Sequence, residues 1–268
     1  MLNEKFAALK NYLRGLESVA VAFSGGVDST FLLKVAHDVL GDNAFAVTAD
    51  SKLIPRRELA EAADFCRREK IKQVTFVVDP LKIDGFIGNP PDRCYICKRA
   101  VFTAIKNLAA SNGAAHVVEG SNLDDTADYR PGMRAVAELG IKSPLLAAAL
   151  NKSEIRALSR TLNLPTADKP SFACLASRFA FGEIISTEKL AKIERAEDFL
   201  RGNGFKQFRV RIHDNLARIE IEPAAFDKLM TLREAVVAEF TACGFDFVAL
   251  DLQGYRVGSM NVGILRNG

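Results

Sequence analysis

The first half of the chain alternates between two patterns of apolar positions. Short runs of apolar and β-branched residues predict strands, and stretches with apolar residues three and four apart predict helices. The predicted strands are Val19–Phe23, Ala44–Thr48, Gln73–Val78, His116–Glu119 and Lys142–Leu146. The predicted helices are Thr30–Val39, Pro55–Lys70, Lys98–Ser111 and Lys152–Leu162. Continuously apolar strands separated by helices predict a doubly wound α/β fold with a parallel sheet covered on both faces.

This pattern ends near Pro165–Pro170, and a different order of elements follows. Ser171–Ile185 has neither periodicity and predicts a loop. The elements expected after the loop are a helix at Thr187–Gly202, strands at Gln207–Ile212 and Leu216–Ile221, a helix from Pro223 to Ala242 and a strand at Phe245–Leu252. We therefore predict two domains, residues 1–170 and a smaller α+β domain at residues 171–268, which we expect to bind substrate and support oligomerisation.

Composition narrows the classes of protein only slightly. The 268 residues are 49% hydrophobic, which is enough for one large or two small cores. The net charge of +3 argues neither for nor against a nucleic-acid partner. No window approaches the ~20 apolar residues that span a bilayer, and the first residues do not resemble a signal peptide. We expect a soluble, cytoplasmic protein with no membrane partner.

A glycine-rich loop, SGGVDST at residues 24–30, joins the first predicted strand to the first predicted helix. Its glycines allow a tight turn that brings backbone N–H groups close to an anion, and its hydroxyls complete a phosphate site at the helix N-terminus. Asp28 is out of place in a pure anion site and suits Mg²⁺ held on a nucleotide. The alternative is an ordinary strand-to-helix turn. The candidate ATP-binding residues here are Ser24, Gly25, Gly26, Asp28, Ser29 and Thr30.

The loop resembles the PP-loop of the ATP pyrophosphatase superfamily, whose members cleave ATP between the α and β phosphates. It lacks the Gly-Lys-Ser/Thr ending of P-loop NTPases. The superfamily includes synthetases that amidate and enzymes that thiolate. Nucleotides in open α/β sheets bind beyond the carboxyl ends of the strands. Thr48 and Ser51, at the end of the second strand, would then lie beside the adenosine, or they form an ordinary strand exit.

Three of the five cysteines suggest sulfur or metal chemistry. Cys94 and Cys97 form a Cys-x-x-Cys pair that can bring two thiolates to one metal or cluster, and Cys174 could be a third ligand. Three thiolates on a [4Fe–4S] cluster leave one iron open to carry a sulfide. Zinc, a persulfide or disulfide relay, and three unconnected cysteines are the alternatives. Cys66 and Cys243 are expected to be buried as small apolar residues.

Nearly the whole chain resembles the ATP-dependent sacrificial sulfur transferase family, LarE. Besides the PP-loop, the resemblance is carried by DRCYICK (92–98), EGSNLDD (119–125), YRPG (129–132), PL (144–145), DKPS (168–171), CLASR (174–178) and GYR (254–256). It implies that ATP activates a carboxylate of pyridinium-3,5-dicarboxylate mononucleotide. The carboxylate then becomes a thiocarboxylate during biosynthesis of the nickel-pincer nucleotide cofactor. The resemblance also implies a homo-oligomer acting on a small-molecule nucleotide.

The cysteines decide which branch of that family the chain resembles. In one branch the cysteine that matches Cys174 gives up its own sulfur and becomes dehydroalanine, and this branch lacks the cysteine pair. Because Cys94 and Cys97 are present, the chain resembles the three-cysteine branch. In that branch a [4Fe–4S] cluster supplies sulfur and the enzyme turns over repeatedly.

An anionic nucleotide substrate requires cations to bind it. Arg209 and Arg211 are two residues apart on a predicted strand and therefore share one face. The family resemblance places phosphate-binding arginines here, in a substrate site between subunits, whereas a solvated strand face is the alternative. Ser177 and Arg178 are further substrate-binding candidates. Glu197 is a candidate by family position, with a solvated helix residue as the alternative.

Three other functions fit parts of the sequence. A tRNA thiolase would also join a PP-loop to three cysteines, but neither extra zinc-ribbon cysteines nor a long basic, aromatic-rich segment for RNA is present. An amidating synthetase would leave the cysteines incidental, and a non-catalytic nucleotide-binding module would use zinc for structure. We expect a small-molecule sulfurtransferase with no nucleic-acid partner. Asp124 and Asp125 are expected to bind metal or to cap a turn.

Overall fold

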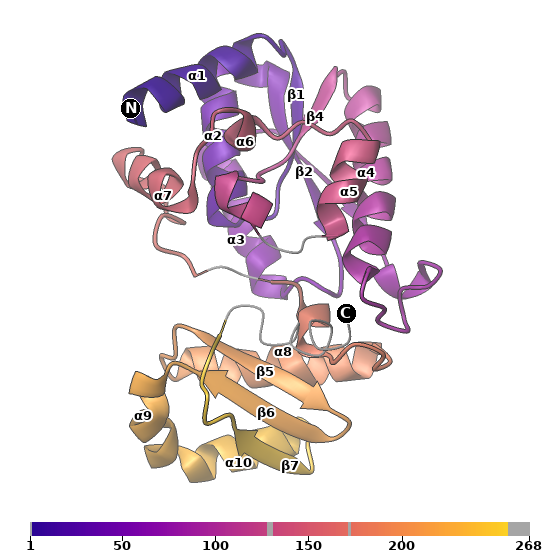
Figure 1. The fold of residues 1–268 in the computed structure, drawn as a ribbon, viewed down its shortest axis with the longest axis vertical. Helices are drawn as coiled ribbons and strands as arrows, with labels where there is room; N and C mark the ends of the chain where they lie inside the picture. Colours follow the sequence, from indigo (N-terminus) through magenta and orange to yellow (C-terminus); the bar gives the residue numbers. More distant parts are fainter. Residues whose placement is uncertain (1, 128–130, 171–172, 257–268) are drawn as a thin grey trace. The chain divides into compact units, whose positions relative to one another are not determined.

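The computed structural model describes residues 2–127, 131–170 and 173–256 (Figure 1). Tyr129, Arg130 and Ser171, which contribute to the family resemblance, lie outside these described residues. The described chain divides into two compact units. The first unit holds the residues up to Asp79 and those from Asp92 to Pro170, and the second holds Pro80–Pro91 and the residues from Ala173 onward.

A parallel sheet forms the centre of the first unit. Its strands are β1 (Val19–Ala22), β2 (Ala44–Asp50), β3 (Gln73–Val77) and β4 (His116–Val118), arranged in the order β3-β2-β1-β4. β1 pairs in parallel with both β2 and β4. The chain therefore runs outward from β1 to β3 and then returns to the other side of β1, so the strand order reverses between β1 and β4. In open sheets of this kind, ligands bind beside that switch point.

Helices cover both faces of this sheet, as the α/β prediction requires. They are α1 (Leu2–Arg14), α2 (Val27–Leu40), α3 (Arg56–Arg68), α4 (Arg93–Ser111), α5 (Pro131–Glu138), α6 (Pro144–Ala147) and α7 (Lys152–Thr161). Val19 and Val21 of β1 pack with apolar residues of α1, α2, α3 and α7. The intervening Ala20 belongs to a second core with α4 and α5. The alternation of side chains along β1 thus divides the core into two layers, and the predicted fold class is confirmed.

Several element boundaries differ from the predictions for local reasons. The strand predicted at Lys142–Leu146 is wrong: Lys142 makes only an isolated bridge to Val118, and α6 begins at Pro144. Proline cannot donate to a strand ladder and suits the first turn of a helix. Asn151 caps α7 through a reciprocal capping box with Glu154.

The second unit combines a three-stranded sheet with helices. It contains α8 (Thr187–Gly202), β5 (Phe208–His213), β6 (Leu216–Ile221), α9 (Phe226–Thr231), α10 (Arg233–Ala242) and β7 (Phe247–Leu250). β6 lies in the middle, antiparallel to β5 and parallel to β7. The helix predicted over Pro223–Ala242 is interrupted, because a short 3-10 turn precedes α9 and Leu232 separates α9 from α10. The predicted β–β–α–β order is otherwise confirmed.

Pro80–Pro91 joins the second unit although it lies within the first half of the sequence. Asn89 is fully buried there. Its side chain donates to the Ala180 carbonyl at 2.5 Å, and its own carbonyl accepts from the Gly182 amide at 3.0 Å. Because a buried amide is costly without partners, these bonds fix the segment to the loop before α8. Among the described helices, none combines the length and apolar character needed to cross a membrane.

Candidate functional site

The glycine-rich loop lies between β1 and α2, at the switch point of the parallel sheet. Gly25 has φ +72°, a conformation that glycine adopts without strain. Gly26 is the N-cap of α2 and has no side chain to cap it, so the first N–H groups of the helix are available to an anion. The hydroxyls of Ser24 and Ser29 lie 3.1 Å apart and share a hydrogen bond. This arrangement can hold phosphate.

The chain leaving β4 passes directly over this loop. A Cβ atom placed on Gly120 would lie 3.1 Å from the Ser29 nitrogen and 3.2 Å from the Asp28 Cβ, closer than side chains normally approach. The carboxylate of Glu119, which precedes Gly120, accepts from the hydroxyls of Ser121 at 2.8 Å and Ser143 at 2.5 Å. These bonds stabilise the turn after β4 and link it to Ser143, the residue before α6.

Asp28 is bound to two residues that were not predicted as site residues. Its carboxylate forms an ion pair with the Lys152 ammonium and accepts a 3.4 Å hydrogen bond from the Asn122 side chain. The Lys152 amide donates to Asp124 at 3.0 Å, and Asp125 accepts from the Asn122 amide at 3.0 Å. Asp125 therefore makes a local hydrogen bond within the turn, which was one of its two expected roles, whereas Asp124 links the turn to the start of α7.

The remaining residues predicted around the nucleotide are held inside the first unit. Thr48 is buried, donates to the Phe23 carbonyl at 3.1 Å and accepts from Gln73 at 2.9 Å. Ser51 accepts from the Leu53 amide at 3.2 Å. Thr30 is fully buried within α2. These contacts give Thr48 and Ser51 structural roles at the strand exit, and their placement beside adenosine stays a prediction.

Lys169 approaches the same loop from the end of the first unit. Its ammonium lies 2.6 Å from carboxylate oxygens of both Glu58 and Glu61 and donates to the Gly25 carbonyl at 3.3 Å. Glu58 is buried, whereas Glu61 is exposed. Lys169 therefore links α3 to the glycine-rich loop, which spacing in the sequence could not indicate because 144 positions separate it from Gly25.

The three candidate cysteines lie in different units. Cys94 and Cys97 occupy the first turn of α4, where residues three apart share a helix face, and Cys174 precedes a short 3-10 turn in the second unit. Cys94 is exposed, while Cys97 and Cys174 are half-buried. Within the part of the chain that the structure describes, no three His, Cys, Asp or Glu side chains gather as metal ligands.

Cys66 and Cys243 are buried, as expected. Burial raises the pKa of the Cys66 thiol to about 12, so this thiol is a poor nucleophile at neutral pH. The pKa of Cys243 is also raised, mainly by burial. Both residues therefore belong to the packing rather than to the candidate chemistry.

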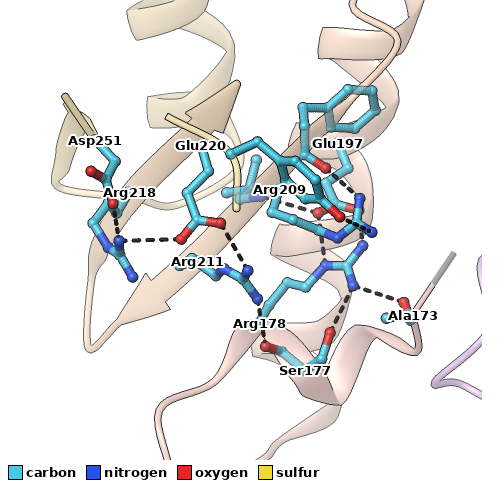
Figure 2. A network of polar contacts seen from close by, with 12 residues as sticks. Ala173, Ser177, Arg178, Glu197, Arg209, Arg211, Arg218, Glu220 and Asp251 are labelled. Carbon is cyan, nitrogen blue, oxygen red and sulfur yellow. Dashed lines mark hydrogen bonds and ion pairs between the residues drawn. The ribbon is translucent and has the colours of Figure 1, made fainter. Parts of the chain in front are cut away.

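A buried ion pair organises the Cys174 loop of the second unit (Figure 2). Two guanidinium nitrogens of Arg178 each donate at 2.8 Å to a different carboxylate oxygen of Glu197, in a bidentate pair. The third nitrogen donates to the Ala173 carbonyl at 2.7 Å, the Ser177 hydroxyl at 2.8 Å and the Cys174 carbonyl at 3.3 Å. Burial raises the pKa of Glu197, but the charge and hydrogen bonds of Arg178 outweigh it and the net pKa is lowered.

Arg209 and Arg211 lie on β5 beside this pair, as Figure 2 shows. Arg211 donates to Glu220 and to the Ser177 carbonyl, both at 2.8 Å. Arg209 lies against the ring of Tyr255, and burial, followed by the charge of Arg178, lowers its pKa to about 10. All three residues at positions 197, 209 and 211 are at most 8% exposed. The solvated alternatives for Glu197 and for the arginine face are therefore wrong.

Two features define the class of protein: a PP-loop at the switch point of a parallel sheet, and a second α+β unit that carries buried arginines. No protein-family model matches the chain. Over 181 residues it is 27% identical to a component of the glutamine-hydrolyzing GMP synthase of Thermoplasma volcanium, covering 60% of this chain and 56% of that relative. The first unit is thus a PP-loop domain of the ATP pyrophosphatase type.

More extensive similarities identify the family. The chain is 41% identical over 264 residues to an uncharacterized protein, slr1717, of Synechocystis, covering 97% of this chain and 98% of the relative. It is 38% identical over 261 residues to the pyridinium-3,5-bisthiocarboxylic acid mononucleotide synthase of Lactiplantibacillus plantarum, covering 97% and 95%. The chain belongs to the LarE family.

Proposed function

We propose that this chain is an ATP-dependent sulfurtransferase of nickel-pincer nucleotide cofactor biosynthesis. It converts a carboxylate of pyridinium-3,5-dicarboxylate mononucleotide into a thiocarboxylate. The observation that carries the proposal is the 38% identity, across almost the whole of both chains, to a protein named as the synthase of the bisthiocarboxylic acid product. The phosphate-binding geometry of the PP-loop supports the use of ATP, as does the similarity to GMP synthase.

The proposed reaction runs in two steps on the same carboxyl group of the substrate. A carboxylate oxygen attacks the α-phosphorus of ATP, and the bond to the β-phosphate oxygen breaks, giving an acyl-adenylate and pyrophosphate. Hydrosulfide-level sulfur then attacks the carbonyl carbon, AMP leaves with the carboxylate oxygen, and the thiocarboxylate remains. The carboxylate is a poor electrophile until AMP becomes its leaving group.

The first unit would bind the ATP. The N–H groups at the start of α2, with Ser24 and Ser29, would hold the departing pyrophosphate and stabilise its charge. We propose that Asp28 helps to hold Mg²⁺, since carboxylate oxygens are ligands that this cation prefers. Its position in the loop and its half-buried carboxylate fit that role.

The smaller domain, which we assign to residues 171–268, would bind the nucleotide acid. We propose that Arg209 and Arg211 hold its phosphate, because they project together from β5 and lie in a buried, cation-rich setting. Arg178 has its guanidinium occupied by Glu197 and by the Cys174 loop. We therefore assign Arg178, Glu197 and Ser177 to positioning the Cys174 backbone for the substrate.

The cysteines suit an iron–sulfur cluster in their chemistry. Cys94 and Cys97 on one helix face would provide two thiolate ligands, and Cys174 at the N-cap of a 3-10 turn would provide a third. When bound, a [4Fe–4S] cluster with three cysteine ligands would supply sulfide-level sulfur from the iron that has no cysteine. The chain's own part is to hold these ligands and to present the activated carbonyl. We also propose a homo-oligomer in the cytoplasm with no nucleic-acid partner.

Two substitutions separate activation from sulfur delivery. We expect Asp28→Ala to abolish pyrophosphate release while iron and acid-labile sulfide per chain stay unchanged after anaerobic reconstitution. Cys97→Ala should lose the iron and sulfide, yet still form AMP with the acid. If Cys97→Ala protein still made thiolated product over many turnovers, the cluster as sulfur source would be wrong. If the wild type formed no AMP with this acid, activation itself would be wrong.

A further inference from the structure

We propose that Lys152 is a phosphate-binding residue of the ATP site. Without nucleotide its ammonium pairs with Asp28, and with nucleotide bound it contacts the phosphates. The proposal rests on the proposed use of ATP and extends it to a residue outside the glycine-rich loop. Lys152 lies 124 positions from Asp28 in the sequence, yet its ammonium forms an ion pair with the Asp28 carboxylate.

The backbone of Lys152 is fixed from both directions. It is the first residue of α7, directly after Asn151, whose side chain accepts from the Glu154 amide at 2.9 Å while Glu154 accepts from the Asn151 amide at 3.0 Å. Its own amide donates to Asp124 at 3.0 Å. Only the four-carbon side chain is then left to move, and it ends in an ammonium that can donate three hydrogen bonds.

The Lys152–Asp28 ion pair contributes little to the stability of the fold. The Lys152 and Asp28 side chains are 27% and 22% exposed. Pairs that remain accessible to water stabilise a fold by only about 0–1 kcal/mol. Asp28 is also part of the nest that holds phosphate, where an unneutralised carboxylate would repel the anion. A cation beside Asp28 is therefore required by the anion site more than by the fold.

Binding of the magnesium complex of ATP changes this balance of charges. The added phosphate oxygens carry more negative charge than one carboxylate, and they enter within reach of a side chain anchored at the edge of the loop. Lys152 is then expected to turn from Asp28 to the β- and γ-phosphates. Its charge would help to neutralise the pyrophosphate that departs. AMP lacks those phosphates, so Lys152 should contribute little to the affinity for AMP.

Binding of α,β-methylene-ATP, which cannot be cleaved between its α and β phosphates, tests this directly by calorimetry without acid or sulfur donor. With Mg²⁺ present, Lys152→Met should bind the analogue about tenfold to a hundredfold more weakly than wild type. Its affinity for AMP should stay within about twofold, and Lys152→Arg should recover most of the analogue binding because it keeps the charge.

Lys5→Met is the matched control. Lys5 of α1 pairs at 2.8 Å with Glu154, which lies on α7 with Lys152, and the Lys5 side chain is 31% exposed. The Lys5 variant therefore loses an ion pair to α7 without a change in the glycine-rich loop. It should bind both ligands as wild type does. The proposal would be overturned if Lys152→Met bound the analogue normally, or if it lost AMP and the analogue equally. If the wild type itself failed to bind the analogue, both this proposal and the proposed use of ATP would fall.

Discussion

Arg178 and Glu197 show how much of a residue's role depends on contacts that sequence spacing hides. Both were candidate substrate residues, and the structure joins them in a buried bidentate pair that also holds the backbone around Cys174. Nineteen positions separate them, across a loop and part of α8, so no periodicity connects them. Lys152 and Asp28 also form an ion pair, and 124 positions separate them in the sequence. Residue types with useful chemistry could be predicted from the sequence, but their partners could not.

Replacement of Glu197 by glutamine should destabilise the second unit strongly. Removing one partner of a buried ion pair leaves the other charge uncompensated, at a cost of about 3–5 kcal/mol. The pKa of Glu197 is lowered in the folded chain. Its stabilising effect is therefore present above the unfolded-state pKa of about 4.3 and is lost as pH falls through the folded-state pKa. The variant should lack this part of the acid dependence.

Urea unfolding of both proteins at neutral and acidic pH measures this difference. Glu188→Gln is a suitable control, because Glu188 is on the same helix, is 77% exposed and pairs with Lys192 four residues along that helix. That variant should change the free energy of unfolding by less than about 1 kcal/mol. An equally small change in the Glu197 variant would show that the pair contributes little to holding the Cys174 loop.

At the scale of elements, most strands were predicted correctly, whereas the start of α4 was not. β1 to β4 and β5 and β6 follow continuous or alternating apolar runs, whose period depends only on local geometry. Helix α4 instead begins at Arg93, five residues before the predicted start, because its first turn carries Cys-Tyr-Ile-Cys rather than an amphipathic pattern. That difference is useful, since it places the cysteine pair on a regular helix.

The close passage of the β4 exit over the PP-loop gives an element-scale prediction. We expect Gly120→Ala to weaken binding of the magnesium–ATP analogue by about tenfold or more, because its Cβ would push against the Ser29 nitrogen at the start of α2. Calorimetry with the uncleavable analogue measures the effect. Gly15→Ala, whose Cβ would make only ordinary contacts of 3.5 Å or more, should bind as wild type does. Normal binding by the Gly120 variant would contradict this account of the loop.

For the whole molecule, the proposed function draws on residues of both units, which sequence patterns describe separately. The first unit carries the PP-loop and the cysteine pair, and the second carries Cys174 and the buried arginines. Pro80–Pro91 belongs to the second unit because of its hydrogen bonds through Asn89, which no local pattern could reveal. Under the proposed function, both activation of the carboxylate and delivery of sulfur would use residues from segments far apart in the chain.

The central claim is that ATP activates a pyridinium carboxylate and sulfur replaces one of its oxygens. The most direct measurement uses anaerobically reconstituted protein with Mg²⁺, ATP, pyridinium-3,5-dicarboxylate mononucleotide and a sulfide source, followed by mass spectrometry of the products. The account predicts a thiocarboxylate in which sulfur has replaced oxygen, with one AMP and one pyrophosphate formed for each sulfur transferred. An unchanged acid with no AMP, or an amide formed when ammonia is added, would contradict it.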